Sequence, residues 1–342
     1  MSFNINNMLN SVQHYTYRNN SAAVVYNNPY VFVASNNTVN MLSDSTGCAI
    51  SSNGQYILSC HYTNGAYLST NYGSTFTKLI IPISILWSNE WTCTISGNGQ
   101  YMAIGNVTGY ISISTDYGSN FIENTTGSLS KNWRNIKMSY TGQYCLASDL
   151  NFIYLSSNSG ETFAVTKDTT GTSNSVGNGF NTNIAMSKTG QYMVCIKNVN
   201  PIDSIKISTD YGVTWKQKNF AVLNNFSYSC AMSEDGQTIY IGSYNPKLYK
   251  ITNISADNPT ITEIGGAASI GCFLILLATD PLYIFISDYQ YGKMWYSING
   301  GTNFTQVVTT TRFQKGAISS DKKYIIGNNI YNALYKLYIS NV

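Results

Sequence analysis

The sequence predicts an all-β protein, a seven-bladed β-propeller built from four-stranded antiparallel blades. Three observations predict it: a composition suited to strands and turns, a short motif that returns about every 45 residues, and a second motif in phase with the first. The 342 residues include 28 Tyr and 27 Gly, and only 10% of them are charged. Tyr, Thr, Ile and Val favour a pleated, half-buried surface, whereas Gly and Asn favour turns.

The first motif is Ser-x-x-Gly-Gln-Tyr, and it defines the units. Five copies are clear, although the fifth ends in Thr, and two degenerate copies continue the same period. A chain with seven such units of this length is typical of a propeller with one four-stranded sheet per unit. The copies are Ser51–Tyr56, Ser96–Tyr101, Ser139–Tyr144, Ser187–Tyr192, Ser233–Thr238, Thr279–Tyr283 and Ser320–Tyr324.

The strands of one unit can be placed from its alternating and apolar runs. In the fourth unit we expect strands at 183–186, 191–196, 204–207 and 214–218. The last unit has only three such runs, but a spare strand-like stretch, Tyr30–Val33, precedes the first unit. We therefore expect this N-terminal strand to complete the last blade and close the ring, which removes the open sheet edges.

The second motif reads Ser-x-Asp/Asn-x-Gly-x-x-aromatic and occurs five times. It resembles the Asp-box, or BNR repeat, found in sialidases, sortilin-type receptors, xyloglucan-active glycosidases and photosystem assembly factors. The resemblance implies a propeller in which each box forms a tight turn at the blade periphery. The side chains that we expect to hold these turns are Asn71, Asp116, Asn158, Asp210 and Asn299.

Composition narrows the classes of partner and the location. The net charge is +3 without a dense basic run, so nucleic-acid binding is not expected. We interpret Lys315, Lys322 and Lys323 as a solvated strand edge or turn. The longest apolar run, Ile270–Ala278, is too short to span a bilayer. We expect a polar leader over 1–20, one propeller domain over 21–342, and a monomer.

The first residues lack the pattern of a secretory signal, so a cytoplasmic location is expected. Heavy use of Asn, Ile, Tyr and Lys is typical of AT-rich genomes, such as those of protists or large DNA viruses. A location in a virion would follow only from a viral source. The seven cysteines form no Cys-x-x-Cys or Cys/His cluster, and we interpret them as small buried hydrophobic residues. No cofactor and no metal site is expected.

A sialidase-like site needs an arginine triad, and this chain has only Arg18, Arg134 and Arg312. A glycosidase site needs two facing carboxylates. The loop carboxylates that qualify by position are Glu90, Asp149, Asp203 and Asp288, and no spacing selects a pair. The sequence therefore favours a non-enzymatic protein. A glycoside hydrolase or lyase with an unrecognised carboxylate site is the alternative.

Aromatic residues and arginines gather where the innermost strands begin. Such residues suit sugar stacking or a protein contact, although packing between blades would use the same residues. We expect a protein or glycan ligand at one mouth of the central channel. The candidate ligand-binding residues are Trp91, Trp133, Arg134, Tyr228, Arg312 and Phe313.

Overall fold

The computed structural model places strands, turns and irregular connections. No helix long and apolar enough to cross a membrane occurs in the described segments. The described residues are 30–34, 45–61, 65–82, 91–107, 109–125, 131–174, 183–196, 204–220, 227–243, 247–265, 272–288, 293–307, 313–329 and 334–339. The expected leader over 1–20 lies outside them.

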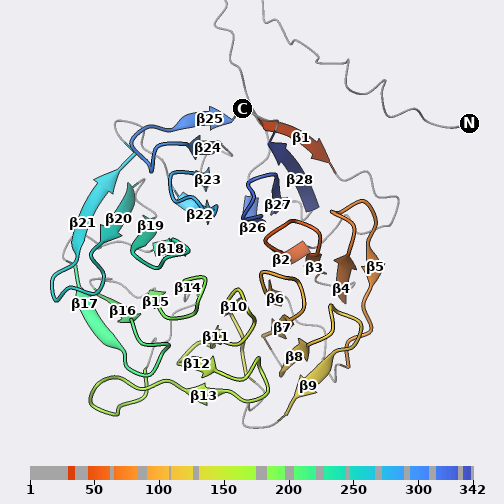
Figure 1. The fold of residues 1–342 in the computed structure, drawn as a ribbon, viewed down its shortest axis with the longest axis horizontal. Coiled ribbons are helices and arrows are strands. Elements are labelled where there is room, and N and C mark those ends of the chain that lie inside the picture. The colour runs from red at the N-terminus through yellow and green to blue at the C-terminus, as the bar shows by residue number, and fades with distance from the viewer. Residues whose placement is uncertain are drawn as a thin grey trace, which may run out of the picture.

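In the part of the chain that the structure describes, the strands form seven four-stranded antiparallel sheets, arranged around a central axis as blades (Figure 1). The innermost strands are β2 (Ser45–Ile50), β6 (Trp91–Ile95), β10 (Asn135–Met138), β14 (Asn183–Met186), β18 (Ser227–Met232), β22 (Cys272–Leu277) and β26 (Phe313–Ile318). The second strands are β3 (Ile57–His61), β7 (Met102–Asn106), β11 (Cys145–Ser148), β15 (Met193–Ile196), β19 (Thr238–Ser243), β23 (Ile284–Asp288) and β27 (Tyr324–Asn329).

The outer half of each blade completes the sheet. The third strands are β4 (Gly65–Ser69), β8 (Ile111–Ser114), β12 (Ile153–Ser156), β16 (Ser204–Ser208), β20 (Lys247–Thr252), β24 (Met294–Ser297) and β28 (Leu334–Ile339). The outermost strands are β5 (Thr77–Lys78), β9 (Ile122–Asn124), β13 (Ala164–Val165), β17 (Lys216–Asn219), β21 (Thr260–Ile264), β25 (Thr305–Val307) and β1 (Tyr30–Ala34). The predictions of an all-β propeller and of four-stranded antiparallel blades are confirmed.

The ring is closed by the innermost strands and by the last blade. Each innermost strand contacts the next, and β26 contacts β2. In the last blade, β1 pairs antiparallel with β28, so that Tyr30 lies opposite Ile339 and Ala34 opposite Tyr335. The predicted closure by an N-terminal strand is therefore confirmed.

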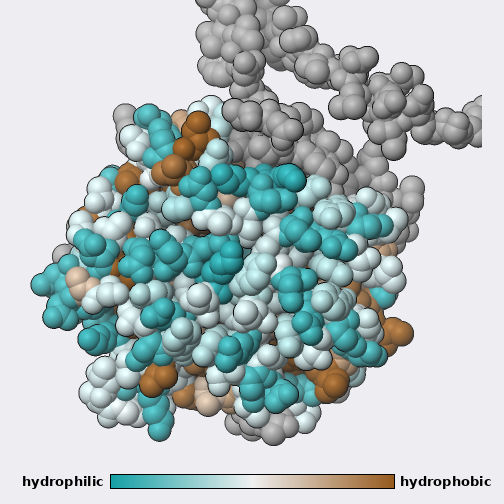
Figure 2. Space-filling model, in the orientation of Figure 1, coloured by the Kyte–Doolittle hydropathy of each residue, from teal (hydrophilic) through white to brown (hydrophobic). Residues whose placement is uncertain are grey.

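The hydrophobic core lies between the blades. Seven buried clusters occur among the described residues, and each takes its side chains from two neighbouring blades. The cluster around Ile57 and Tyr67 of the first blade, for example, includes Ile326 of the last. One face of the ring is mostly hydrophilic or neutral, with hydrophobic residues in small patches near the rim (Figure 2). A blade buries its faces only against its neighbours, which explains why the ring must close.

The first motif makes a contact between neighbouring blades. The glycine of each copy has a positive φ, and its Cα faces the tyrosine ring of the preceding blade so closely that a Cβ would overlap the ring. This contact therefore requires a glycine in one unit and a tyrosine in the preceding unit. The pairs are Tyr56 with Gly99, Tyr101 with Gly142, Tyr144 with Gly190, Tyr192 with Gly236, and Tyr324 with Gly54.

The two degenerate copies begin one residue earlier than the sequence predicts. The hydrogen bond that joins the first and last residues of the motif runs from Ala278 N to Tyr283 O and from Ser319 N to Tyr324 O. Lys322 therefore occupies the glycine position of the last blade, with a φ of 66°. Its ammonium lies 3.6 Å from the centre of the Tyr283 ring in the preceding blade.

A belt of hydrogen bonds follows the same turns around the axis. In five of the seven copies, the residue after the first position donates its N–H to the matching carbonyl of a neighbouring blade, with distances of 2.8–2.9 Å. The donors are Ser320, Ser52, Gly97, Tyr140 and Lys188, and the last acceptor is Glu234. At the sixth blade Thr279 Oγ1 continues the belt, donating to Ser320 O at 3.0 Å and lying 2.8 Å from Glu234 Oε1.

Candidate ligand-binding channel

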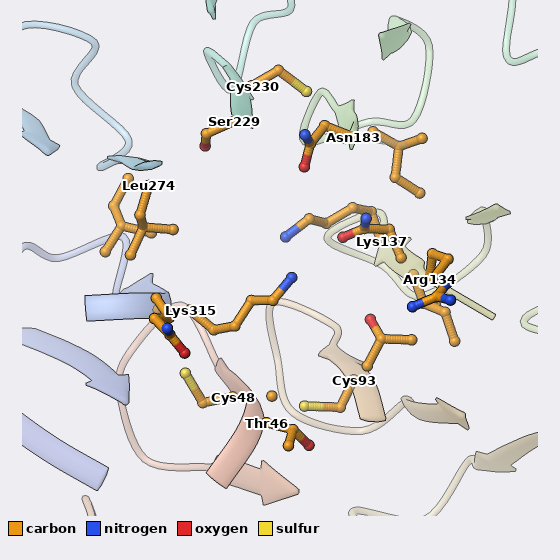
Figure 3. Close-up of a pocket in the computed structure, with 18 of the residues that line it drawn as sticks. Thr46, Cys48, Cys93, Arg134, Lys137, Asn183, Ser229, Cys230, Leu274 and Lys315 are labelled. Carbon is orange, nitrogen blue, oxygen red and sulfur yellow. The ribbon is translucent and has the colours of Figure 1, made fainter. Parts of the chain in front are cut away.

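A cavity of about 140 Å³ lies in the centre of the ring. Residues in or directly before all seven innermost strands line it (Figure 3). Most of them come from the first half of these strands, whereas the belt of hydrogen bonds follows their ends. The cavity thus opens toward the mouth at which the innermost strands begin.

Three basic side chains line the cavity: Arg134, Lys137 and Lys315. Lys137 belongs to β10 of the third blade and Lys315 to β26 of the last blade, and their ammonium ends point into the same central space (Figure 3). Arg134 directly precedes β10. No Asp or Glu is among the described residues that line the cavity. The wall of the cavity is therefore positively charged.

The charges of Lys137 and Lys315 oppose the effect of burial on the pKa of cysteine thiols in other blades. Burial raises the pKa of the Cys48 thiol in β2, and Cys93 raises it further, whereas the ammonium groups of Lys137 and Lys315 act in the opposite direction. Burial also raises the pKa of Cys230 in β18 to about 12, against an opposing effect of Lys137. Lys137 thus acts to lower the pKa of a thiol in three other blades, at Cys48, Cys93 and Cys230, as expected for an ammonium near the axis.

Hydrogen bonds between blades hold the wall in place. Trp91 N donates to Thr46 Oγ1 at 3.2 Å, and Ile275 N donates to Ser229 Oγ at 3.0 Å. The indole Nε1 of Trp91 is buried and finds no acceptor among the described residues. The Trp91 ring packs against the buried cluster between the first and second blades, although the residue itself borders the cavity.

The structure places the six predicted ligand-binding residues differently. Trp91 and Arg134 line the cavity, as a ligand site at the channel requires. Tyr228 belongs to β18, but its side chain lies outside what the structure describes. Arg312 lies outside the described residues altogether. The structure thus brings two of the six candidates together.

Trp133 and Phe313 do not line the channel, contrary to the prediction. Trp133 is 1% exposed, donates from Nε1 to Gly109 O at 2.9 Å and meets the Tyr154 ring edge-on at 5.1 Å between centroids. Phe313 is fully buried beside Phe285. Neighbouring residues of an extended chain point to opposite sides, so Arg134 reaches the channel while Trp133 fills the space between blades.

The loop carboxylates considered for glycoside hydrolysis have other surroundings. Asp149 is buried and accepts hydrogen bonds from Asn151 N, Phe152 N and the Tyr154 hydroxyl. Asp288 is also buried, at the end of β23 in a different blade. Glu90 and Asp203 lie outside the described residues. The two described carboxylates are not part of the cavity wall.

The second motif forms the same turn in all five copies. Its serine Oγ accepts a hydrogen bond from the glycine N–H at 2.8–2.9 Å and donates to the Asp or Asn side chain. That side chain accepts from the N–H four residues later at 2.9–3.0 Å. A positive φ falls on the residue before the glycine as well, as at Tyr117 and Tyr211. These bonds employ Asn71, Asp116, Asn158, Asp210 and Asn299 within the turns.

The sequence patterns did not identify Lys137 and Lys315 as residues of the channel. Lys315 was interpreted as part of a solvated edge or turn, but it lies within β26 and lines the cavity. Lys137 stands between Ile136 and Met138, which is ordinary strand alternation. Both lysines lie inside an innermost strand, and the faces of each blade are buried against its neighbours. A charged residue at such a position is the signal that could have identified Lys137 and Lys315.

Comparison with known proteins shows the fold. No family model and no curated protein matches the chain. Among solved structures, the chain resembles YCF48 bound to D1 peptide, with 13% identity, a TM-score of 0.67, and coverage of 94% of this chain and 99% of that one. YCF48 from Cyanidioschyzon merolae follows with 11% identity, a TM-score of 0.67, and coverage of 92% and 99%.

A third similar structure is the Cps50 (Swd1) β-propeller domain of Myceliophteria thermophila. It is 8% identical, with a TM-score of 0.66, and the match covers 91% of this chain and 100% of that one. At such identities the likeness concerns the fold alone. The chain has the β-propeller fold.

Proposed function

We propose that this protein is a non-enzymatic interaction propeller that binds a segment of a protein ligand at one mouth of its central channel. The observation that carries the proposal is the cavity to which all seven innermost strands contribute. Its wall carries the charged donors of Arg134, Lys137 and Lys315. Arginine in a buried pocket is a common element of a protein-binding hot spot.

The size of the cavity favours a side chain over a larger ligand. Pockets that enclose drug-sized molecules have volumes of about 300–1,000 Å³, whereas this cavity has about 140 Å³. One side chain of a peptide fits inside, with its main chain across the mouth. Support also comes from YCF48, a propeller of similar fold, which was solved bound to D1 peptide.

A glycan ligand has less support than a peptide. The aromatic rim that suggested sugar stacking included Trp133 and Phe313, and both are buried. The Trp91 ring packs against the cluster between the first and second blades. The glycoside hydrolase alternative has lost support in the same way, since Asp149 is engaged in its own loop.

We further propose that the five Ser-x-Asp/Asn-x-Gly turns are Asp-box turns with a structural role. Their serine and Asp or Asn side chains bond within the turn, and their last aromatic residues are buried in four of the five copies, as Phe121 and Trp215 show. Ligand contact is assigned to the channel and not to these turns.

Selection from a random peptide library on the immobilised full chain tests the proposal, with a glycan array as a parallel arm. Gln314 lines the cavity, so Gln314→Trp fills it without a change of charge. Gln217→Trp makes the same change on the exposed outer strand β17. We expect selected peptides to bind the Gln314→Trp variant at least about 10-fold more weakly, and the Gln217→Trp variant as well as the wild type.

Two outcomes would contradict the proposal. One is a selection that yields no peptide, and the other is a set of peptides that bind both variants as well as the wild type. A glycan that binds the wild type and is lost in the Gln314→Trp variant, without any peptide binding, would replace the protein ligand by a carbohydrate.

A further inference from the structure

We infer that the group that enters the channel is an oxyanion, a carboxylate or phosphoryl group, seated between Lys137 and Lys315. The inference names the chemistry of the ligand and rests on the proposed function only for the larger molecule to which the oxyanion belongs.

The charges of the cavity wall carry the inference. Three basic side chains and no carboxylate are found among the described residues that line it. The Lys137 ammonium has no hydrogen-bond or ion-pair partner among the described residues, whereas Lys188 pairs with Glu234 at 2.9 Å and Lys247 with Glu263 at 2.7 Å. Two like charges that face one space from opposite sides repel, and an anion between them removes that repulsion.

The arrangement of the donors also suits an anion. Lys137 and Lys315 come from the third and the last blade and point into one space (Figure 3). Arg134 adds a planar guanidinium, whose parallel N–H groups match two oxygens of a carboxylate or phosphate. Ammonium and guanidinium donors therefore line the same cavity.

The rigid wall makes the site selective for a small group. Blade-to-blade bonds such as Trp91 N to Thr46 Oγ1 fix the innermost strands in place. Backbone groups held in this way need no reorganisation when a ligand binds, which lowers the cost of binding. With about 140 Å³ of space, the cavity fits the terminal oxyanion of a side chain.

Isothermal titration of the full chain at low ionic strength tests the inference without any peptide. The probes are inorganic phosphate, pyrophosphate and acetate, because exposed charges are screened at high salt. The test variant is Lys137→Met with Lys315→Met. The control is Lys78→Met with Lys216→Met, two exposed lysines on the outer strands β5 and β17. Both pairs remove two positive charges, so they differ only in place.

We expect at least one of these anions to bind the wild type, to bind the channel pair at least about 10-fold more weakly, and to bind the control pair unchanged. Tighter binding of phosphate assigns a phosphoryl group, and tighter binding of acetate assigns a carboxylate. Absence of binding for all three anions, or equal weakening in both pairs, would overturn the inference.

The two proposals fail separately. Peptides could fail to bind the Gln314→Trp variant and still bind the Lys137→Met, Lys315→Met variant as well as the wild type. This result would support a protein ligand and refute the oxyanion. Bound phosphate without any selected peptide would do the reverse.

Discussion

The ring of Tyr324 in the last blade lies against the Cα of Gly54 in the first blade. The same contact joins four other pairs of neighbouring blades, but this one lies at the interface where the beginning and the end of the described chain meet. Tyr324 also lies 5.6 Å from the Tyr72 ring of the first blade, between ring centroids. The Tyr324 side chain thus contacts two turns of the first blade, at Gly54 and at Tyr72.

Gly54→Ala should destabilise the closed ring. Gly54 has a φ of 79°, which costs an L-residue about 1–2 kcal/mol, and a Cβ there would overlap the Tyr324 ring. With the overlap included, we expect the free energy of unfolding in urea to fall by about 2–4 kcal/mol.

Gly171→Ala separates the two causes. Gly171 has a φ of 82° and open space around the added Cβ, so this variant should lose only about 1–2 kcal/mol. In a Tyr324→Ala background, Gly54→Ala should cost no more than Gly171→Ala does. An undiminished cost in that background would contradict the assigned contact.

Lys322→Met should weaken the interface between the sixth and the last blade. The variant keeps the length of the side chain but loses the contact with the Tyr283 ring and the ion pair with Asp280 at 3.2 Å. We expect a loss of about 1 kcal/mol in urea unfolding, smaller at high salt.

The neighbouring Lys323→Met is its control. The Lys323 side chain is 65% exposed and lies 3.7 Å from Asp321, so its loss should leave stability within about 0.5 kcal/mol of the wild type. Equal losses for the two variants would show that the ring contact of Lys322 contributes nothing.

Acid should weaken the turns that contain aspartate. Burial alone would raise the pKa of Asp210, but hydrogen bonds from Thr214 and Ser208 outweigh it and hold the pKa below 3.8. At Asp116 the hydrogen bonds from Asn120 lower the pKa in the same way. A carboxylate with a lowered folded-state pKa stabilises the fold above its unfolded pKa, and that contribution is lost as the pH falls through the folded value.

The double variant Asp116→Asn, Asp210→Asn should therefore lose less stability than the wild type between pH 7 and about pH 2.5. At pH 7 we expect a change below about 1 kcal/mol, because asparagine already holds this turn at Asn71, Asn158 and Asn299. Urea unfolding at both pH values measures the difference. An identical loss on acidification in variant and wild type would show that these carboxylates do not contribute.

Trp133→Ala should act through stability and not through the channel. The side chain is 1% exposed and fills the space between the second and third blades, so its removal should cost about 3–5 kcal/mol. Arg134→Ala, one residue later, removes a cavity side chain and should cost less than about 1 kcal/mol. Similar thermal unfolding temperatures for the two variants would contradict this division.

The repeat architecture could be predicted because it depends on contacts that recur in the sequence. The contact between a glycine with a positive φ and a tyrosine ring requires both residue types. Glycine and tyrosine therefore recur, at the positions of Gly54 and Tyr56, with the period of the blade. Where other residues make the contact, the sequence motif is no longer recognisable. Lys322 replaces the glycine, and the degenerate copy was therefore placed one residue late.

The channel could not be predicted to the same extent, because it depends on which side each strand residue faces in the closed ring. Trp133 and Arg134 are adjacent in the sequence, and nothing in their identity tells which one reaches the axis. Lys137 and Lys315 are distant in the sequence, and they share a cavity only after β26 has come to lie beside β2.

The pairing of β1 with β28 sets an order of events during synthesis. The strand Tyr30–Ala34 leaves the ribosome long before Leu334–Ile339, its only partner in the sheet. Throughout the assembly of the intervening blades its backbone N–H and C=O groups have no native partner, and an unpaired strand invites association with other chains. This strand therefore stays open to association with other chains until Leu334–Ile339 has been made.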